Sequence, residues 1–171
     1  MIKSTVITMA ATSLLALSGS VDADIAITTG TTSSTVTTTD SPDCSGAAAS
    51  AGVIWPPNHT MVSETIVGVT DPFGQPLVIV VTGIMQDESV AAIGSGNTSP
   101  DGTGIGTSTA QIRAERAGPG TGRIYFISFS ATNPQAAQCT GTISVFVPHD
   151  QGQGFTPIDT GARFDSTQTY F

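Results

Sequence analysis

The run Arg-Ile-Tyr-Phe-Ile-Ser-Phe-Ser-Ala-Thr, residues 123–132, decides the fold class of this chain. By the period of two of an extended strand, Tyr125, Ile127 and Phe129 point to one face of it. Four further apolar or β-branched runs, cut by Gly, Pro, Asn and Asp, have the lengths of strands, namely 61–70, 77–85, 109–116 and 140–147. This pattern predicts an all-β antiparallel sandwich, in which the nearly unbroken apolar run 77–85 is buried on both faces.

Two short motifs bracket the predicted strands. Trp-Pro-Pro-Asn-His occupies residues 55–59, just before the first strand, and Val-Pro-His-Asp occupies residues 147–150, at the end of the last one. A chain of 171 residues has room for one domain of about 100 residues and its flanking segments. We therefore place one sandwich domain at residues 44–150.

The two flanks are predicted to lack a core of their own. Residues 1–23 are interpreted as a signal peptide, with Lys3 before a short apolar stretch, and a buried strand or short helix is the alternative. Residues 24–43 are dominated by Ser and Thr and are predicted to form a disordered stalk. Residues 151–171 are predicted to be a flexible tail. We expect secretion to the extracellular space or cell surface, with the periplasm as the other destination.

The charge of the chain bears on its partners. The formal net charge is −8, only 11% of residues are charged, and the sole lysine is Lys3. A chain with so few cations cannot neutralise many phosphates, so nucleic acid is excluded as a partner. An extracellular protein or a carbohydrate is expected instead. No later stretch approaches 18 apolar residues, so no transmembrane anchor is expected after signal removal.

The strand order predicts which side chains meet at each end of the sandwich. Residues 87–107 are rich in Gly, Ser, Asn and Asp and are expected to form long loops with one or two short strands. If this segment restores the usual sandwich order, the strand at 109–116 runs in the same direction as the strand at 61–70. One end then gathers Asp71, Glu115, Arg116, Arg123, His149 and Asp150. The other end gathers Cys44, residues 55–59, Asp87, Glu88, Asn133 and Cys139.

The two cysteines, Cys44 and Cys139, are predicted to form a disulfide. They fall at the same end of the predicted sandwich, and an exported protein meets an oxidising environment. They are too few and too far apart in the sequence for a zinc site of the Cys-x-x-Cys kind. The alternative is a pair of buried free thiols.

The three last predicted strands resemble a known family. Ile-Arg-Ala-Glu-Arg at 112–116, the Gly-rich turn after it, the run 122–133 and the final strand look like the last strands of cadherin-like, PKD-like and HYR-type modules. Together with the two bracketing motifs, the resemblance covers residues 44–150. It implies an immunoglobulin-like β-sandwich of exported bacterial proteins, acting as a spacer, an adhesion unit or a carbohydrate-contacting accessory rather than as an enzyme.

The resemblance also implies a calcium site. In cadherin-like modules an acidic residue at the end of the fifth strand helps to hold calcium, and Glu115 matches that position, with Asp150 as its partner. Asp71 joins them at the same predicted end, and oxygen ligands of this kind suit Ca2+. The alternative is a set of structural ion pairs, in which Arg116 and Arg123 hold Glu115 and Asp150.

The opposite end offers other candidates. His59 is expected to fix its loop rather than ligate a metal, and Trp55 is either a core residue or a platform for a sugar ring. No Gly-x-Ser-x-Gly elbow, His-Glu-x-x-His helix or phosphate loop occurs. The alternative functions are therefore a carbohydrate-binding accessory domain or a small extracellular glycan hydrolase, with Glu88 and Asp101 as paired carboxylates.

Overall fold

The structure is a computed structural model that describes residues 41–152 and 158–169. The predicted signal peptide, residues 1–23, and all but the last three residues of the predicted stalk lie outside the described residues. The described part is all-β and contains no helix. Its strands are β1 (Ala48–Ala49), β2 (Met61–Val67), β3 (Val78–Gln86), β4 (Gly102–Thr103), β5 (Thr109–Arg113), β6 (Gly122–Thr132), β7 (Gln138–Pro148) and β8 (Phe164–Asp165).

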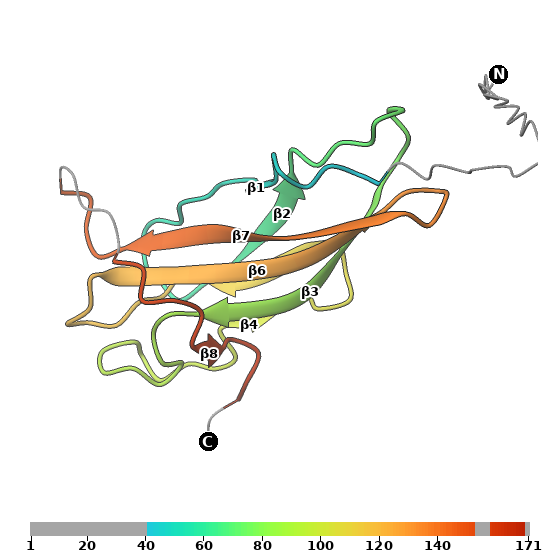
Figure 1. Cartoon of the computed structure of the whole chain (residues 1–171). Coiled ribbons are helices and arrows are strands. Elements are labelled where there is room, and N and C mark those ends of the chain that lie inside the picture. Colours follow the sequence, from blue (N-terminus) through green and yellow to red (C-terminus); the bar gives the residue numbers. More distant parts are fainter. Residues whose placement is uncertain (1–40, 153–157, 170–171) are drawn as a thin grey trace, which may run out of the picture. The chain divides into compact units, whose positions relative to one another are not determined.

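The strands form two antiparallel four-stranded sheets, which confirms the predicted β-sandwich. One sheet has the order β1-β2-β5-β4, and the other has the order β7-β6-β3-β8 (Figure 1). β6 and β7 pair over their whole lengths, from Gly122 opposite Pro148 to Thr132 opposite Gln138. These two strands, of 11 residues each, are the longest of the second sheet.

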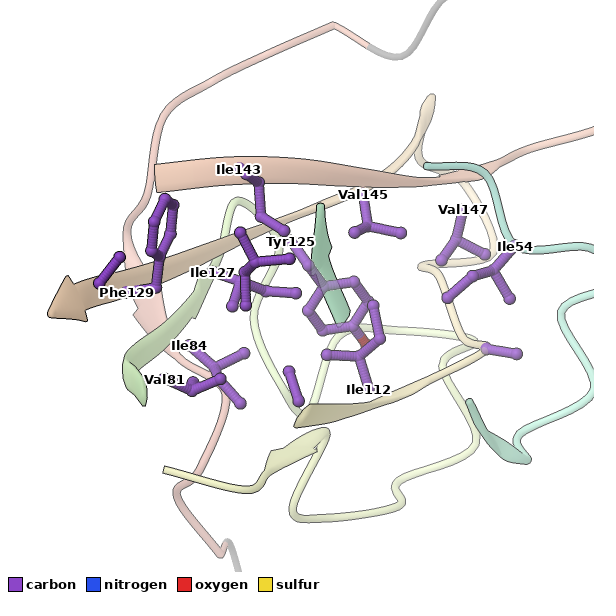
Figure 2. Packing of buried hydrophobic residues seen from close by; sticks show 14 residues of the cluster. Ile54, Val81, Ile84, Ile112, Tyr125, Ile127, Phe129, Ile143, Val145 and Val147 are labelled. Atoms are coloured by element: carbon purple, nitrogen blue, oxygen red, sulfur yellow. The ribbon is translucent and has the colours of Figure 1, made fainter. Parts of the chain in front are cut away.

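The core lies between the two sheets and is built by the alternation seen in the sequence. Tyr125, Ile127 and Phe129 of β6 are buried on the inner face, in one cluster with Ile112 of β5 and Val145 of β7 (Figure 2). Burying one such side chain contributes about 1.5–3 kcal/mol. Burial of this cluster therefore stabilises the packing of the two sheets against each other.

β3 departs from the prediction that it is buried on both faces. Val81 and Ile84 are buried, whereas Val78 is 65% exposed. Between Val81 and Gly83 the register with β6 shifts, so Thr82 is an additional, exposed residue. The prediction was wrong because an antiparallel sandwich covers only the inner face of each sheet, and apolar residues on the outer face are not thereby buried.

One side of the sandwich is closed by the segment that precedes β2. Asp43 pairs with Thr70, and Val53 forms a parallel bridge with Phe146 of β7. Cys44 and Cys139 are joined by a disulfide with a Cα–Cα distance of 5.9 Å, as predicted. This segment therefore ties the edge of the first sheet to the edge strand of the second.

The other side is closed by residues predicted to be a flexible tail. β8 pairs with β3, and the amide of Ser166 donates to the carbonyl of Ile84 at 3.0 Å. The carbonyl of Ser166 accepts from the amides of Asp101 and Gly102 at 2.9 and 2.8 Å. Residues 164–166 thus fill the gap between β3 and β4. They do so with backbone groups, which leave no apolar pattern in the sequence.

The strand directions correct the predicted grouping of side chains at the two ends. β5 is antiparallel to β2, and β3 is antiparallel to β6. The predicted parallel direction of the strands at 61–70 and 109–116 was wrong because β4, two residues long, adds a reversal between β3 and β5. We call the two ends of the sandwich the disulfide end, at Thr132 and Gln138, and the Arg123 end, at the start of β6.

Candidate functional site

Charged side chains gather in the interior at the Arg123 end. Arg123, on the inner face of β6, has no exposed surface. Its Nη1 lies 2.6 Å from Asp101 Oδ2, its Nε lies 3.3 Å from Glu88 Oε2, and its Nη2 lies 3.6 Å from Glu115 Oε1. Two carboxylates from the connection between β3 and β4, and one from the connection between β5 and β6, therefore surround one buried guanidinium. A buried cation is tolerated only with partners of this kind.

Arg113, the last residue of β5, is the second cation. Its Nε lies 3.5 Å from Asp101 Oδ1 and 4.0 Å from Glu115 Oε2. Its two terminal nitrogens donate to the carbonyls of His59 and Pro100 at 2.9 and 2.7 Å. We call Glu88, Asp101, Glu115, Arg113 and Arg123 the ion-pair cluster. Through Arg113, this cluster also holds the loops before β2 and β4.

His59 lies at the solvent side of the ion-pair cluster. Its Nδ1 donates to Glu115 Oε2 at 3.1 Å, and the hydroxyl of Thr98 donates to the same oxygen. The His59 side chain is 47% exposed, whereas that of Glu115 is fully buried. A Cβ on Gly96 would lie 2.8 Å from the imidazole Cε1, so the ring closely abuts the Gly96 backbone. As predicted from the Pro-Pro context, His59 fixes its loop by a hydrogen bond.

Two neutral side chains complete the surroundings of the ion-pair cluster. Gln86 Nε2 donates to Asp101 Oδ2 at 3.0 Å, and the Tyr125 hydroxyl donates to the carbonyl of Arg113 at 2.9 Å. Burial raises the pKa of Tyr125, so its hydroxyl keeps the proton that it donates. The Arg123 guanidinium also lies over the Tyr125 ring, 5.8 Å from its centroid.

The charge balance of the ion-pair cluster affects its carboxylates. Three carboxylates face two guanidinium groups, and Asp101 and Glu115 have no exposed surface. Burial raises the pKa of Asp101, and the neighbouring Arg123 opposes that shift. The pKa of Asp87 is raised as well, by burial, although its Oδ1 accepts a hydrogen bond from the amide of Ile124.

The three predicted calcium ligands do not meet. Asp71 lies at the disulfide end, where it accepts hydrogen bonds from the amides of Phe73 and Gln75 and from the Asn133 side chain. Glu115 contacts Arg123, and ten residues of β-structure, about 33 Å, separate Arg123 from Asn133. The grouping of Asp71 with Glu115 was wrong because the direction of β2 and β3 relative to β6 was wrong.

Asp150 is separate from both other predicted ligands. It is exposed, its Oδ2 lies 3.3 Å from His149 Nδ1, and its Oδ1 accepts from the amide of Gly152. Within residues 41–152 and 158–169, no group of three or more His, Cys, Asp or Glu side chains is arranged to hold a metal ion. The predicted calcium site therefore has no common location in this part of the chain.

The predicted structural arginines have different roles. Arg123 pairs with Glu115, as the ion-pair alternative requires, and also with Glu88 and Asp101. Arg116 donates to the carbonyl of Ala117 at 3.1 Å and forms no salt bridge with any residue that the structure describes. Hydrogen bonds from Gly152 and His149 hold the pKa of Asp150 below its ordinary value, and the charge of Arg116 adds to this effect. Arg113 takes the place predicted for Arg116. One signal in the sequence indicated part of this: Arg123 shares the period of two with Tyr125, which places it on the core face.

The ion-pair cluster has limited chemistry to offer a substrate. Asp101 and Glu88, the paired carboxylates of the hydrolase alternative, both contact Arg123, and the side chain of Glu88 is only 14% exposed. In contrast, Trp55 is 40% exposed. Of its two predicted roles, core residue or platform for a sugar ring, the structure therefore rules out the core residue.

Comparison of the chain with protein-family models, with curated proteins and with solved structures found no match. In the described part of the chain, no helix has the length and apolar character needed to cross a bilayer. What the chain does is therefore inferred from the geometry of its own residues.

Proposed function

We propose that the chain is an exported immunoglobulin-like β-sandwich that acts without catalysis as an interaction or adhesion module at the cell surface or outside the cell. One observation carries this proposal. Glu88 and Asp101, the carboxylates that a glycan hydrolase would need, are bound together with Glu115 to the buried Arg123. Such a cluster holds loops in place and leaves the surface for binding.

Two features support the immunoglobulin-like part of the proposal. Read in chain order, the sheets β1-β2-β5-β4 and β7-β6-β3 have the strand order of the ABED and CFG sheets of constant-type immunoglobulin domains. Tyr125 lies near the start of the strand that corresponds to F, and its hydroxyl bonds the backbone of Arg113 upstream. A tyrosine in this role is a hallmark of the fold.

The disulfide supports the extracellular part. Cys44 precedes the first strand, and Cys139 lies on β7, so the bond closes almost the whole sandwich, at a sequence separation of 95. Structural disulfides form and persist in oxidising compartments. This agrees with the predicted signal peptide at residues 1–23.

The proposal is tested by expressing the full chain in a bacterial host and locating it by cell fractionation. We expect a product that begins near Asp24, lies outside the cytoplasm and is oxidised, as read by mass spectrometry. A chain lacking residues 2–23 is the control and should stay in the cytoplasm. Purified mature chain should also co-sediment with cells. A full chain that stays inside the cell with both thiols free would contradict export.

A second measurement separates the module from the hydrolase alternative. The purified chain and an Asp101→Asn variant are incubated with a panel of glycans, and released reducing ends are counted. We expect no release by either protein. Release by the native chain that the variant has lost would favour the glycan hydrolase.

A further inference from the structure

The outer face of β6 and β7 carries an ordered array of hydroxyl groups. The side chains that alternate with the core residues of these two strands point away from the first sheet. Thr140, Thr142 and Ser144 of β7 are exposed, and their neighbours on β6 are half-buried. We call the six residues the hydroxyl face: Ser128, Ser130, Thr132, Thr140, Thr142 and Ser144.

The hydroxyl face is regular because its residues are paired across the two strands. Ser128 lies opposite Thr142, and Ser130 lies opposite Thr140. Neighbouring strands are about 4.8 Å apart, and outward side chains on one strand repeat at about 6.7 Å. The hydroxyls of Ser128 and Thr142 are 3.1 Å apart. A hydroxyl in such a pair keeps further capacity to donate or accept, so it can bond a ligand without first being freed.

An apolar platform continues the hydroxyl face toward the Arg123 end. Phe126 and Phe146 lie on the same outer face and are half-buried. Val53 bridges Phe146 and is 57% exposed, and Trp55, two residues further along, is 40% exposed. Ile54, which lies between them, is buried, so Val53 and Trp55 are the exposed side chains of this segment. Exposed apolar side chains that adjoin one another mark binding surfaces more often than isolated ones do.

The strand segments under the hydroxyl face carry no charge, although the chain contains 13 acidic residues. Residues 126–132, 138–146 and 78–83 include no charged side chain. The uncharged area ends at the edge of the sheet where β8 pairs with β3 (Figure 1). There the charged Asp165 lies beside Met85. At that end Ile124, an outer-face residue of β6, is covered and only 1% exposed.

The chemistry of this surface selects an uncharged, hydroxyl-rich polymer. Sugar rings present apolar C–H faces, which stack on aromatic side chains, and hydroxyls, which pair with Ser and Thr. A polyanion would find no cation here. On the hydroxyl face itself, a second sheet would find only Ser and Thr side chains and no large ones to interdigitate with. Resting on the proposed interaction module, we propose that the hydroxyl face and Trp55 bind an uncharged polysaccharide.

The test is a depletion assay with the purified mature chain on three uncharged polysaccharides, namely microcrystalline cellulose, chitin and cross-linked dextran, and on alginate beads as the anionic comparison. We expect binding to at least one uncharged polymer and none to alginate. The variant Thr140→Asp/Thr142→Asp and the variant Trp55→Ala should each weaken binding at least tenfold. Thr140→Arg/Ser144→Arg should weaken it as well, because either sign of charge is costly to desolvate on this face.

Matched controls separate the face from the rest of the surface. Ser63→Asp/Thr65→Asp places the same charges on the exposed side of β2, and Phe73→Ala removes an exposed ring that lies at the disulfide end. Both should bind like the native chain, and melting curves verify that every variant is folded.

Several results would overturn the proposal. These are no binding to any of the three uncharged polymers, equal binding to alginate, or equal losses in the control variants. A concentration-dependent dimer in sedimentation equilibrium, lost in Thr140→Asp/Thr142→Asp, would instead assign the face to a second copy of the chain. None of these results changes the fractionation outcome, so a failure here leaves the proposed export and cell binding separately testable.

Discussion

At the scale of single residues, Arg123 is the fully buried cation that pairs with all three carboxylates of the ion-pair cluster. Replacing it with alanine leaves Asp101 and Glu115 in the interior without their closest cation, and such a loss costs about 3–5 kcal/mol. Arg116→Ala is the matched control and should change the free energy of unfolding by less than about 0.5 kcal/mol, since Arg116 forms no salt bridge with a described residue. Urea unfolding of both variants measures the difference. Equal effects would mean that the ion-pair cluster contributes little to stability.

Asp71 is expected to make the free energy of unfolding depend on pH in the acid range. Burial alone raises its pKa, but hydrogen bonds from Gln75, Phe73 and Asn133 outweigh burial and hold the pKa below 3.8, the ordinary value. A lowered pKa in the folded state contributes stability above 3.8 that is lost as the pH falls below it. Asp71→Asn cannot titrate, so its stability should fall less between pH 4 and the acid transition. Parallel acid unfolding curves for the two proteins would contradict this assignment.

At the scale of elements, β8 is the one whose role is least visible in its own sequence. Truncation after Gly152 removes the backbone hydrogen bonds that Ser166 makes with Ile84, Asp101 and Gly102. At about 1 kcal/mol for each bond, the free energy of unfolding should fall by about 3 kcal/mol. Truncation after Gln168 keeps these bonds and serves as the control. If both truncated chains unfold at the same urea concentration as the full chain, β8 is not a structural element.

At the scale of the whole molecule, the disulfide joins the segment before the first strand to β7, the last long strand in the sequence. In the chain-entropy model, a bond that closes a loop of 95 residues stabilises the fold by about 4–5 kcal/mol. Adding a reductant should therefore lower the melting temperature of the native chain. Cys44→Ser/Cys139→Ser should melt at the reduced value and ignore the reductant. A reductant effect on that double variant would show that the effect does not come from this bond.

Calcium is also a question about the whole molecule, because the proposed ligands come from different ends of the sandwich. Asp71 bonds Asn133, beyond the end of β6, whereas Glu115 contacts Arg123 near its start. We therefore expect the melting temperature to be the same in millimolar Ca2+ and in chelator. A rise with Ca2+ that Glu115→Gln abolishes would restore the calcium interpretation.

The alternation of residues 123–132 was enough to predict that β6 is a strand and which of its side chains form the core. The same period placed Arg123 beside Tyr125 on the inner face. With only two cysteines in the chain, the partner of Cys44 followed as well. The strand and its core face depend on local geometry, which the side chains of a single strand encode, whereas the disulfide pairing followed from the number of cysteines.

The meeting of Glu88, Asp101 and Glu115 around Arg123 was decided by the tertiary structure. It depends on the reversal at β4 and on the closure by β8, and each of these strands has two residues. A strand this short has no side-chain period, because its contribution is a few backbone hydrogen bonds to distant partners. The sequence by itself therefore determined the fold class, the core face and the disulfide. Only the packing of the backbone determined which loops share an end, and hence that Asp71 lies far from Glu115.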